Sequence, residues 1–215
     1  MINEKELGHI LLATITLVFV VSFKDILSTG VNYTTLGILS IFIALIILTN
    51  VLAKKATAHY HAATLEIKTW NWQRFGFARQ RKFKKPLPMG IIAPIITTLI
   101  TQGNFFLFTT LESKIEGTSA RATKSHGRFR FTELTDSHQA LIIASGVVAN
   151  LALAILAYLI DLGQLATFSI YYATYSMIPF GNLDGTKIFF GGRNLWFALA
   201  IITAIFLSFA LLIPR

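Results

Sequence analysis

The feature that most constrains this chain is a series of long segments that contain no Asp, Glu, Lys or Arg. A helix needs about 20 mainly apolar residues to cross the roughly 30 Å of hydrocarbon in a bilayer. Each of these segments is close to that length, so the sequence predicts several membrane-spanning helices. The uncharged segments are 7–23, 33–53, 89–111, 139–160, 162–183 and 194–214.

The overall composition supports the same conclusion. Hydrophobic residues make up 54% of the 215 residues and charged residues only 13%, about half the usual share of a soluble domain. So few charges cannot cover the surface of a soluble protein, and the absence of cysteine excludes disulfides and thiolate metal sites. We therefore expect an all-α polytopic membrane protein in the cell membrane, with 1–215 as one domain and the lipid bilayer as its first partner.

The segment 54–88 carries most of the positive charge. It holds nine of the 19 Lys and Arg residues and a single acid, Glu66. By the positive-inside rule this loop is cytoplasmic, which places the N-terminus in the cytoplasm as well. An anionic-lipid or nucleic-acid surface is the alternative interpretation. The interspersed aromatic residues suit a belt at headgroup level better than a base-stacking platform, so we expect no nucleic-acid partner.

Two segments are less certain from composition. The segment 89–111 is long enough to span, yet prolines crowd its start and Gln102-Gly103-Asn104 interrupts its end. It either crosses the membrane or turns back within it, which is tolerated where protein buries the bent backbone. The segment 129–135 alternates apolar and polar residues and predicts a small β element at the membrane edge.

Asp184 and Asn150 are the polar residues of most interest. Asp184 ends a run of 22 uncharged residues, between Pro179 and Gly185. A carboxylate there either lies just outside the bilayer or is a ligand or ion-pair partner in a polar pocket. Asn150 follows the small residues Ser145 and Gly146 at helical spacing, which favours close helix packing and a hydrogen bond across the interface.

These two segments resemble motifs of the site-2 proteases, a family of intramembrane zinc metalloproteases. Leu183-Asp184-Gly185 is similar to the L-D-G motif, whose Asp is a zinc ligand in that family. The stretch from Ser145 to Asn150 is similar to the A-G-P-x-x-N helix of the family, and it comes first along the chain, as it does there. The resemblance implies a site-2-protease-like helical core. It covers about residues 36–194 and includes Ala58, Glu66 and Trp70 at the spacing of an upstream A…A-E-x-x-x-W stretch.

The motif on which that family's chemistry depends is missing. H-E-x-x-H supplies two zinc ligands one turn apart and a Glu that activates water. The resemblance places it at 50–54, where the corresponding residues are Asn50, Val51 and Lys54. Gly185 is retained, whereas Ser176, Gly181 and Val147 stand where the family has Asn, Pro and Pro. We therefore regard Asn50, Val51, Lys54 and Asp184 as a degenerate metal site with no catalytic residues, supported by Asn150, Ser176 and Gly185.

Histidines elsewhere offer a weaker metal site. His59 and His61 are the only close pair, and with Asp184 they would make three ligands. On a helix, however, residues two apart point in nearly opposite directions, and no acid lies between them to act as a base.

Two functions follow from the resemblance. The first is a catalytically inactive homologue that needs no cofactor and binds or regulates the transmembrane helix of a client protein. The second is an active intramembrane protease with zinc in a non-standard site. The family geometry also implies that 89–111 re-enters, so that 54–88 and 185–193 lie on one side. We predict that Lys54 and Asp184 form an ion pair where zinc would sit, with a hydrogen bond from Asn50.

Overall fold

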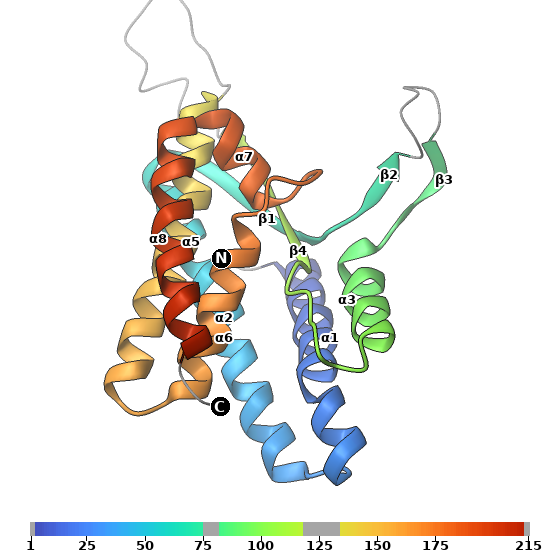
Figure 1. The fold of residues 1–215 in the computed structure, drawn as a ribbon. Helices are drawn as coiled ribbons and strands as arrows, with labels where there is room; N and C mark the ends of the chain where they lie inside the picture. Colours follow the sequence, from blue (N-terminus) through green and yellow to red (C-terminus); the bar gives the residue numbers. More distant parts are fainter. Residues whose placement is uncertain (1–2, 75–81, 118–133, 213–215) are drawn as a thin grey trace, which may run out of the picture.

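The computed structural model describes residues 3–74, 82–117 and 134–212, and most of them are helical. The helices form an elongated bundle, with two small antiparallel sheets at one end (Figure 1). The helices are α1 (Glu4–Thr29), α2 (Tyr33–Tyr60), α3 (Met89–Ile100), α5 (Asp136–Leu159), α6 (Gly163–Ser176), α7 (Asp184–Gly191) and α8 (Arg193–Leu212). The strands are β1 (Ala63–Thr69), β2 (Trp72–Arg74), β3 (Lys82–Leu87) and β4 (Leu111–Gly117).

Four helices in the described part of the chain, α1, α2, α5 and α8, are long and apolar enough to cross a membrane. They match four of the five predicted spans, and their ends extend up to seven residues beyond the predicted ones. Large apolar side chains are exposed along their outer faces, for example Ile201 and Phe209 on α8. Such faces are costly in water and suited to lipid, so the helices indicate a membrane protein.

Helix α5 is the most enclosed of the four. It packs against α2 on one side and α6 on the other, and its first half also meets α7. Its buried positions include several small residues, among them Ala140, Gly146 and Ala154. Small side chains allow the helix backbones to approach closely, as the sequence predicted for this segment.

The prediction of a full span over 162–183 does not match the helix that forms there. Helix α6 has 14 residues and ends at Ser176, which gives a length of about 21 Å at 1.5 Å per residue. Turns with Pro179 and Gly181 follow before α7 begins at Asp184. Apolar composition alone cannot locate this end, because most of α6 is buried by protein.

The segment 89–111 turns back on itself. Helix α3 has 12 residues, about 18 Å, and after a turn the chain returns in extended form to β4. Its two ends meet at Trp70: Gly90 N donates to Trp70 O, and Trp70 N donates to Thr110 O. The chain therefore leaves and returns at the same place, which is the geometry of a re-entrant segment; its placement in a bilayer stays a prediction.

The described parts of the segment 54–88, residues 54–74 and 82–88, are mostly helix and strand. Helix α2 continues through Lys54 to Tyr60, β1 pairs with β4 with Ile67 opposite Ser113, and β2 pairs with β3 to form an arm. The predicted β element over 129–135 lies almost wholly outside the described residues. The described part of the chain has its β structure at 63–74, 82–87 and 111–117 instead.

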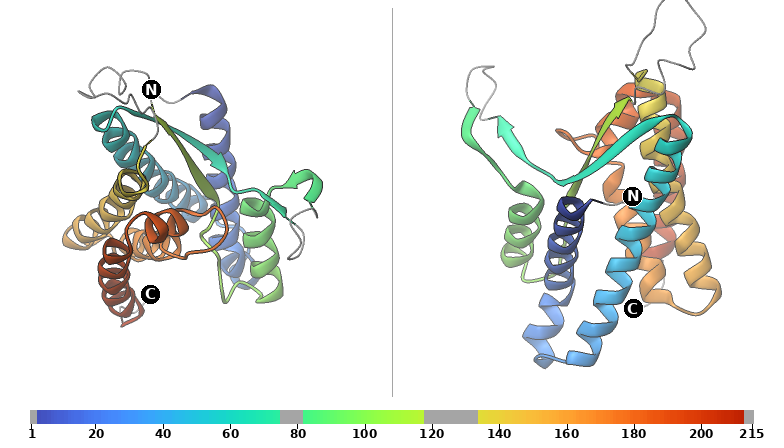
Figure 2. Two further views of the ribbon diagram at one scale, coloured as in Figure 1. Left: turned by 90° about the horizontal axis from the view of Figure 1, so that it is seen from above. Right: turned by 180° about the vertical axis from the view of Figure 1, so that it is seen from behind.

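The two-stranded sheet of β1 and β4 lies across the ends of α1 and α2 (Figure 2). Glu6 ties these elements together, because its carboxylate accepts from Lys55 Nζ at 2.6 Å and from Ile67 N at 3.0 Å. Most described charged residues lie toward this end of the bundle. Only Lys24, Asp25 and Asp161 lie toward the opposite end, near the α1–α2 and α5–α6 turns.

Candidate functional site

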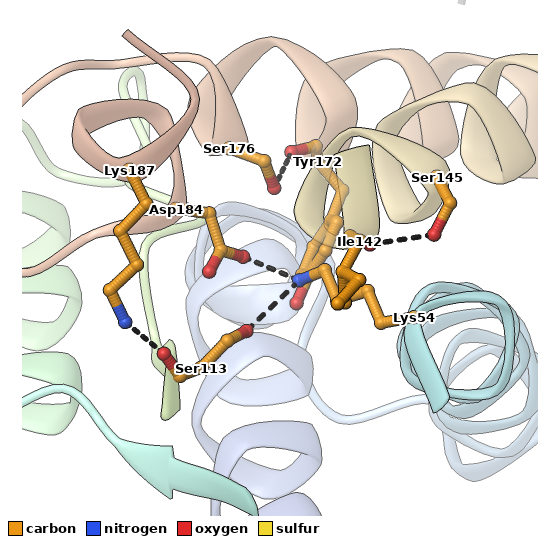
Figure 3. Close-up of polar contacts among 8 residues, drawn as sticks. All are labelled: Lys54, Ser113, Ile142, Ser145, Tyr172, Ser176, Asp184 and Lys187. Carbon is orange, nitrogen blue, oxygen red and sulfur yellow. Dashed lines mark hydrogen bonds and ion pairs between the residues drawn. The ribbon is translucent and has the colours of Figure 1, made fainter. Parts of the chain in front are cut away.

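The candidate site is centred on Lys54 and Asp184, which form the predicted ion pair. Lys54 Nζ lies 2.5 Å from Asp184 Oδ2 and 3.4 Å from Ser113 Oγ (Figure 3). The two residues are 2% and 7% exposed, so the pair is almost fully removed from solvent. Three elements far apart in the sequence, α2, β4 and α7, therefore contribute to one buried polar centre.

The crossing of α2 and α5 makes room for the lysine side chain. A Cβ at position 146 would lie 2.5 Å from Lys54 Cε and 2.8 Å from Asn50 Nδ2. Real Cβ atoms do not approach other atoms so closely, so Gly146 is needed for Lys54 to pass along α5. The small-residue segment that resembles the A-G-P-x-x-N helix thus leaves the space beside α5 that the Lys54 side chain occupies.

Asp184 is positioned by the N-terminus of α7, of which it is the first residue. A carboxylate in the first turn interacts favourably with the free N–H groups and the helix dipole. Gly185 next to it packs against backbone, because a Cβ there would lie 2.5 Å from Ile178 O and Met177 C. Any larger residue at Gly185 would push the start of α7, and with it Asp184, away from α6.

A second lysine and a second acid lie beside the pair. Lys187, one turn after Asp184, donates to the backbone carbonyl of Ser113 (Figure 3). Burial lowers the pKa of Lys187, while Asp184 and Glu112 act in the opposite direction. Burial raises the pKa of Glu112, and its Oε2 has no hydrogen-bond partner among the described residues. The cluster thus balances two lysines against two carboxylates.

Asn50 does not make the predicted hydrogen bond. It lies one turn before Lys54 and is 1% exposed, yet within the described structure its Nδ2 has no partner. Position 50 faces Gly146 on α5, whereas the carboxylate approaches the lysine from α7, so the amide does not reach it. Val51, the next residue, is buried in the hydrophobic core.

Asn150 and Ser176, the other supporting residues, do not contact the ion pair through hydrogen bonds. The Asn150 side chain is fully buried, and neither of its polar atoms is bonded in the part of the chain that is described. Its backbone carbonyl accepts from Ser169 Oγ, which joins α5 to α6. Ser176 Oγ donates to Tyr172 O within α6. The cross-helix bond expected from the Asn150 amide is therefore made by a serine to its backbone instead.

A cavity of about 10 Å³ lies next to Asp184. This is close to the smallest space that holds one water molecule. Thr109, Thr110 and Asp184 line the cavity, and each has a buried side-chain oxygen without a protein partner in the described residues. One water would have enough polar partners here to bind.

An aromatic cluster packs at the turn that leads from α6 to Asp184. Trp70 and Trp72 pack against Phe180, with ring centroids 6.1 Å and 5.2 Å from it. Phe180 lies in the turn between α6 and α7, so the cluster fixes the turn that leads to Asp184. Aromatic pairs at these distances add to the stability gained from burial.

The weaker metal site from the sequence is not assembled. His59 lies in the last turn of α2 beside a polar cavity, and the His61 ring packs on the His138 ring at 5.0 Å. Over the residues that the structure describes, no three His, Cys, Asp or Glu side chains are grouped so that they could hold a metal ion. Asp184 faces Lys54 instead of either histidine.

Sequence reasoning missed Ser113, Lys187 and Glu112. Ser113 and Glu112 carry no motif, and their only signal is that they follow a long uncharged segment. Lys187 lies in the segment 185–193, which the sequence analysis placed on the same side as 54–88 without singling out this residue. Comparison of the chain with models of known protein families, with curated proteins and with solved structures gave no match.

Proposed function

We propose that this protein is a catalytically inactive relative of the site-2 proteases, which binds or regulates transmembrane clients without cutting them. The observation that carries the proposal is the ion pair between Lys54 and Asp184. By the resemblance, Asp184 corresponds to a zinc ligand and Lys54 to the second histidine of H-E-x-x-H. The ammonium group thus supplies the positive charge that the buried carboxylate requires, at the place where the metal would be.

The chemistry of the three substituted positions supports the same proposal. Asn50 and Lys54 cannot replace two neutral imidazoles as zinc ligands, because a protonated lysine has no free electron pair. Val51 cannot activate water as the motif's Glu does. On this proposal the protein keeps the helical frame that the resemblance implies but lacks the groups that would cleave a peptide bond.

A larger cavity next to the small cavity at Asp184 offers a place for a client helix. It has a volume of about 410 Å³ and lies between α6, α8 and the chain that follows α3. Its lining is mostly apolar, and it adjoins the small cavity at Asp184 through the shared side chain of Tyr175. An apolar cavity that lies between apolar helices suits the side chains of a transmembrane segment. The lining includes Phe105, Phe106, Tyr171, Tyr175, Ile178 and Leu207.

The test restores the missing motif. We expect purified native protein to show no chelator-sensitive cleavage of transmembrane peptides. The triple variant Asn50→His, Val51→Glu, Lys54→His should bind one zinc ion, and addition of Asp184→Leu to it should abolish that binding. Chelator-sensitive cleavage by the triple variant alone would show that the chain presents a transmembrane segment at this site.

Two outcomes would contradict the proposal. Zinc-dependent cleavage by the native protein would make it an active protease. The triple variant could also fail to bind zinc although its thermal stability equals that of the native protein, which would show that it is folded. That result would mean that the pair does not occupy a former metal site. The alternative of an active site built from His59, His61 and Asp184 has no supporting contact among the described residues.

A further inference from the structure

The arm formed by β2 and β3 carries positive charge immediately before the apolar helix α3. Lys84 and Lys85 on β3 are both exposed, and neither forms a salt bridge within the described structure. From residue 67 to residue 111 the sequence has seven Lys and Arg residues and no acid. Lys84 and Lys85 thus have no acidic partner among the described residues.

The position of α3 sets the depth of the arm relative to a bilayer. The helix is 12 residues long, has three residues with large exposed apolar side chains, and begins two residues after β3 ends. Those side chains, Ile96, Leu99 and Ile100, lie in its second half, away from the arm. A helix of about 18 Å reaches little more than half of the roughly 30 Å of hydrocarbon. Its N-terminal end therefore belongs at the bilayer surface.

The partly exposed Trp72, in the cluster of Trp70, Trp72 and Phe180, indicates the same level. Trp70 bonds the start of α3 through its backbone, and Trp72 lies opposite Leu87 in the β2–β3 ladder. Tryptophan rings collect at the level of the lipid headgroups. Lys85 is four residues from Met89, so it lies within about 14 Å of the helix start along an extended chain. That places the lysines at or near the phosphates.

We propose that Lys84 and Lys85 bind the phosphate of anionic lipid headgroups, so that the β2–β3 arm selects an anionic leaflet. Basic residues close to an anionic membrane each contribute about a factor of five to binding. Because the interaction is between exposed charges, salt weakens it. The inference requires α3 to lie in the bilayer and does not depend on client binding, so it can fail or hold independently of the proposed function.

The experiment compares short-chain phosphatidylglycerol with short-chain phosphatidylcholine, using full-length protein in neutral detergent. Native mass spectrometry gives the apparent dissociation constant for each lipid. We expect Lys84→Gln with Lys85→Gln to weaken phosphatidylglycerol binding about tenfold or more and to leave phosphatidylcholine binding unchanged. The pair Lys84→Arg with Lys85→Arg should retain the native preference, and raising the salt from 0.05 to 0.5 M should reduce it.

The matched control is Lys24→Gln with Lys114→Gln, which removes the same charge elsewhere on the surface and should leave the preference intact. Equal binding of phosphatidylglycerol by the native protein and by the Lys84→Gln, Lys85→Gln variant would overturn the proposal. So would an equal loss in the control. A single-stranded oligonucleotide could also displace bound phosphatidylglycerol at a lower concentration than free phosphatidylglycerol does. That result would assign the arm to nucleic acid and would overturn the proposal as well.

Discussion

At the scale of single residues, the buried pair of Lys54 and Asp184 dominates the candidate site. Moving two charges out of water is expensive, and their attraction repays that cost only when the geometry is good. Here one oxygen of the carboxylate is paired, and the other, Oδ1, has no protein partner among the described residues. We therefore expect the pair to be costly to break and of little net value to stability.

The first prediction concerns the removal of one or both charges. Lys54→Met and Asp184→Leu should each lower the free energy of unfolding by about 3–5 kcal/mol, because each strands a buried charge. The double variant should recover much of that loss. Thermal unfolding in detergent measures all three. Lys187→Met is the control and should cost less, because its ammonium donates to a carbonyl instead of a carboxylate. Additive losses in the double variant would contradict the pairing.

The second prediction concerns pH and Glu112, whose pKa is raised by burial. Between the ordinary pKa and the raised one, the folded protein keeps the proton that the unfolded chain has lost. The contribution of Glu112 to the free energy of unfolding is therefore greatest at low pH, and it is lost as the pH rises through that window. Glu112→Gln should remove this loss. The melting temperature of the variant, relative to that of the native protein, should therefore increase as the pH rises.

Glu116→Gln is the matched control for Glu112, since it changes an exposed acid on the same strand. Its melting temperature should follow that of the native protein at every pH. A difference between Glu112→Gln and native protein that does not change with pH would show that Glu112 does not titrate in this range.

At the scale of the elements, the contact between α2 and α5 decides whether the lysine can reach its partner. The two helices run antiparallel (Figure 1), and Gly146 faces both Asn50 and Lys54 on consecutive turns of α2. A helical glycine normally costs about 0.5–1 kcal/mol relative to alanine, so its presence here needs a packing reason. The close approach of the lysine stem is that reason.

We predict that Gly146→Ala destabilises the protein by about 1–3 kcal/mol, because the new methyl group overpacks the crossing. The control is Gly37→Ala, also in a helix, where a Cβ would meet nothing within 4 Å. That change should be neutral or stabilising by up to about 1 kcal/mol. Chemical denaturation in mixed micelles measures both, and equal effects of the two substitutions would contradict the role of Gly146.

At the scale of the whole molecule, charge is distributed unevenly between the two ends of the bundle. The end with the sheets, the arm and the candidate site carries the basic excess, and the other end has few charges among the described residues. By the positive-inside rule we infer that the end with the site faces the cytoplasm, together with the N-terminus. The return of the chain after α3 keeps β4 and α7 at that same end.

The fourth prediction tests this orientation with single cysteines, which the Cys-free chain accepts without background. In intact cells, Ser28→Cys in the last turn of α1 should react with a membrane-impermeant maleimide added outside. Asn182→Cys and Lys114→Cys should react only after the membrane is permeabilised. Labelling of Asn182→Cys from outside would contradict both the orientation and the re-entrant placement of α3.

The sequence by itself determined the features that depend on local composition. The helices α1, α2, α5 and α8 follow from uncharged runs of bilayer length, since apolar side chains and internal backbone hydrogen bonds are what such a helix requires. The pairing of Lys54 with Asp184 was also predictable, although only through the resemblance, because nothing local relates two residues 130 positions apart.

Only the tertiary structure decided where α6 ends, how the chain returns after α3, and which polar groups surround the pair. Ser113, Lys187 and Glu112 reach the site because β4 and α7 pack beside α2, and no periodicity in the sequence encodes that contact. Asn50 and Asn150 lie where the sequence analysis expected them, and yet the predicted hydrogen bonds are not formed among the described residues. A hydrogen bond depends on distances of tenths of an ångström, which are fixed only when the helices are packed against one another.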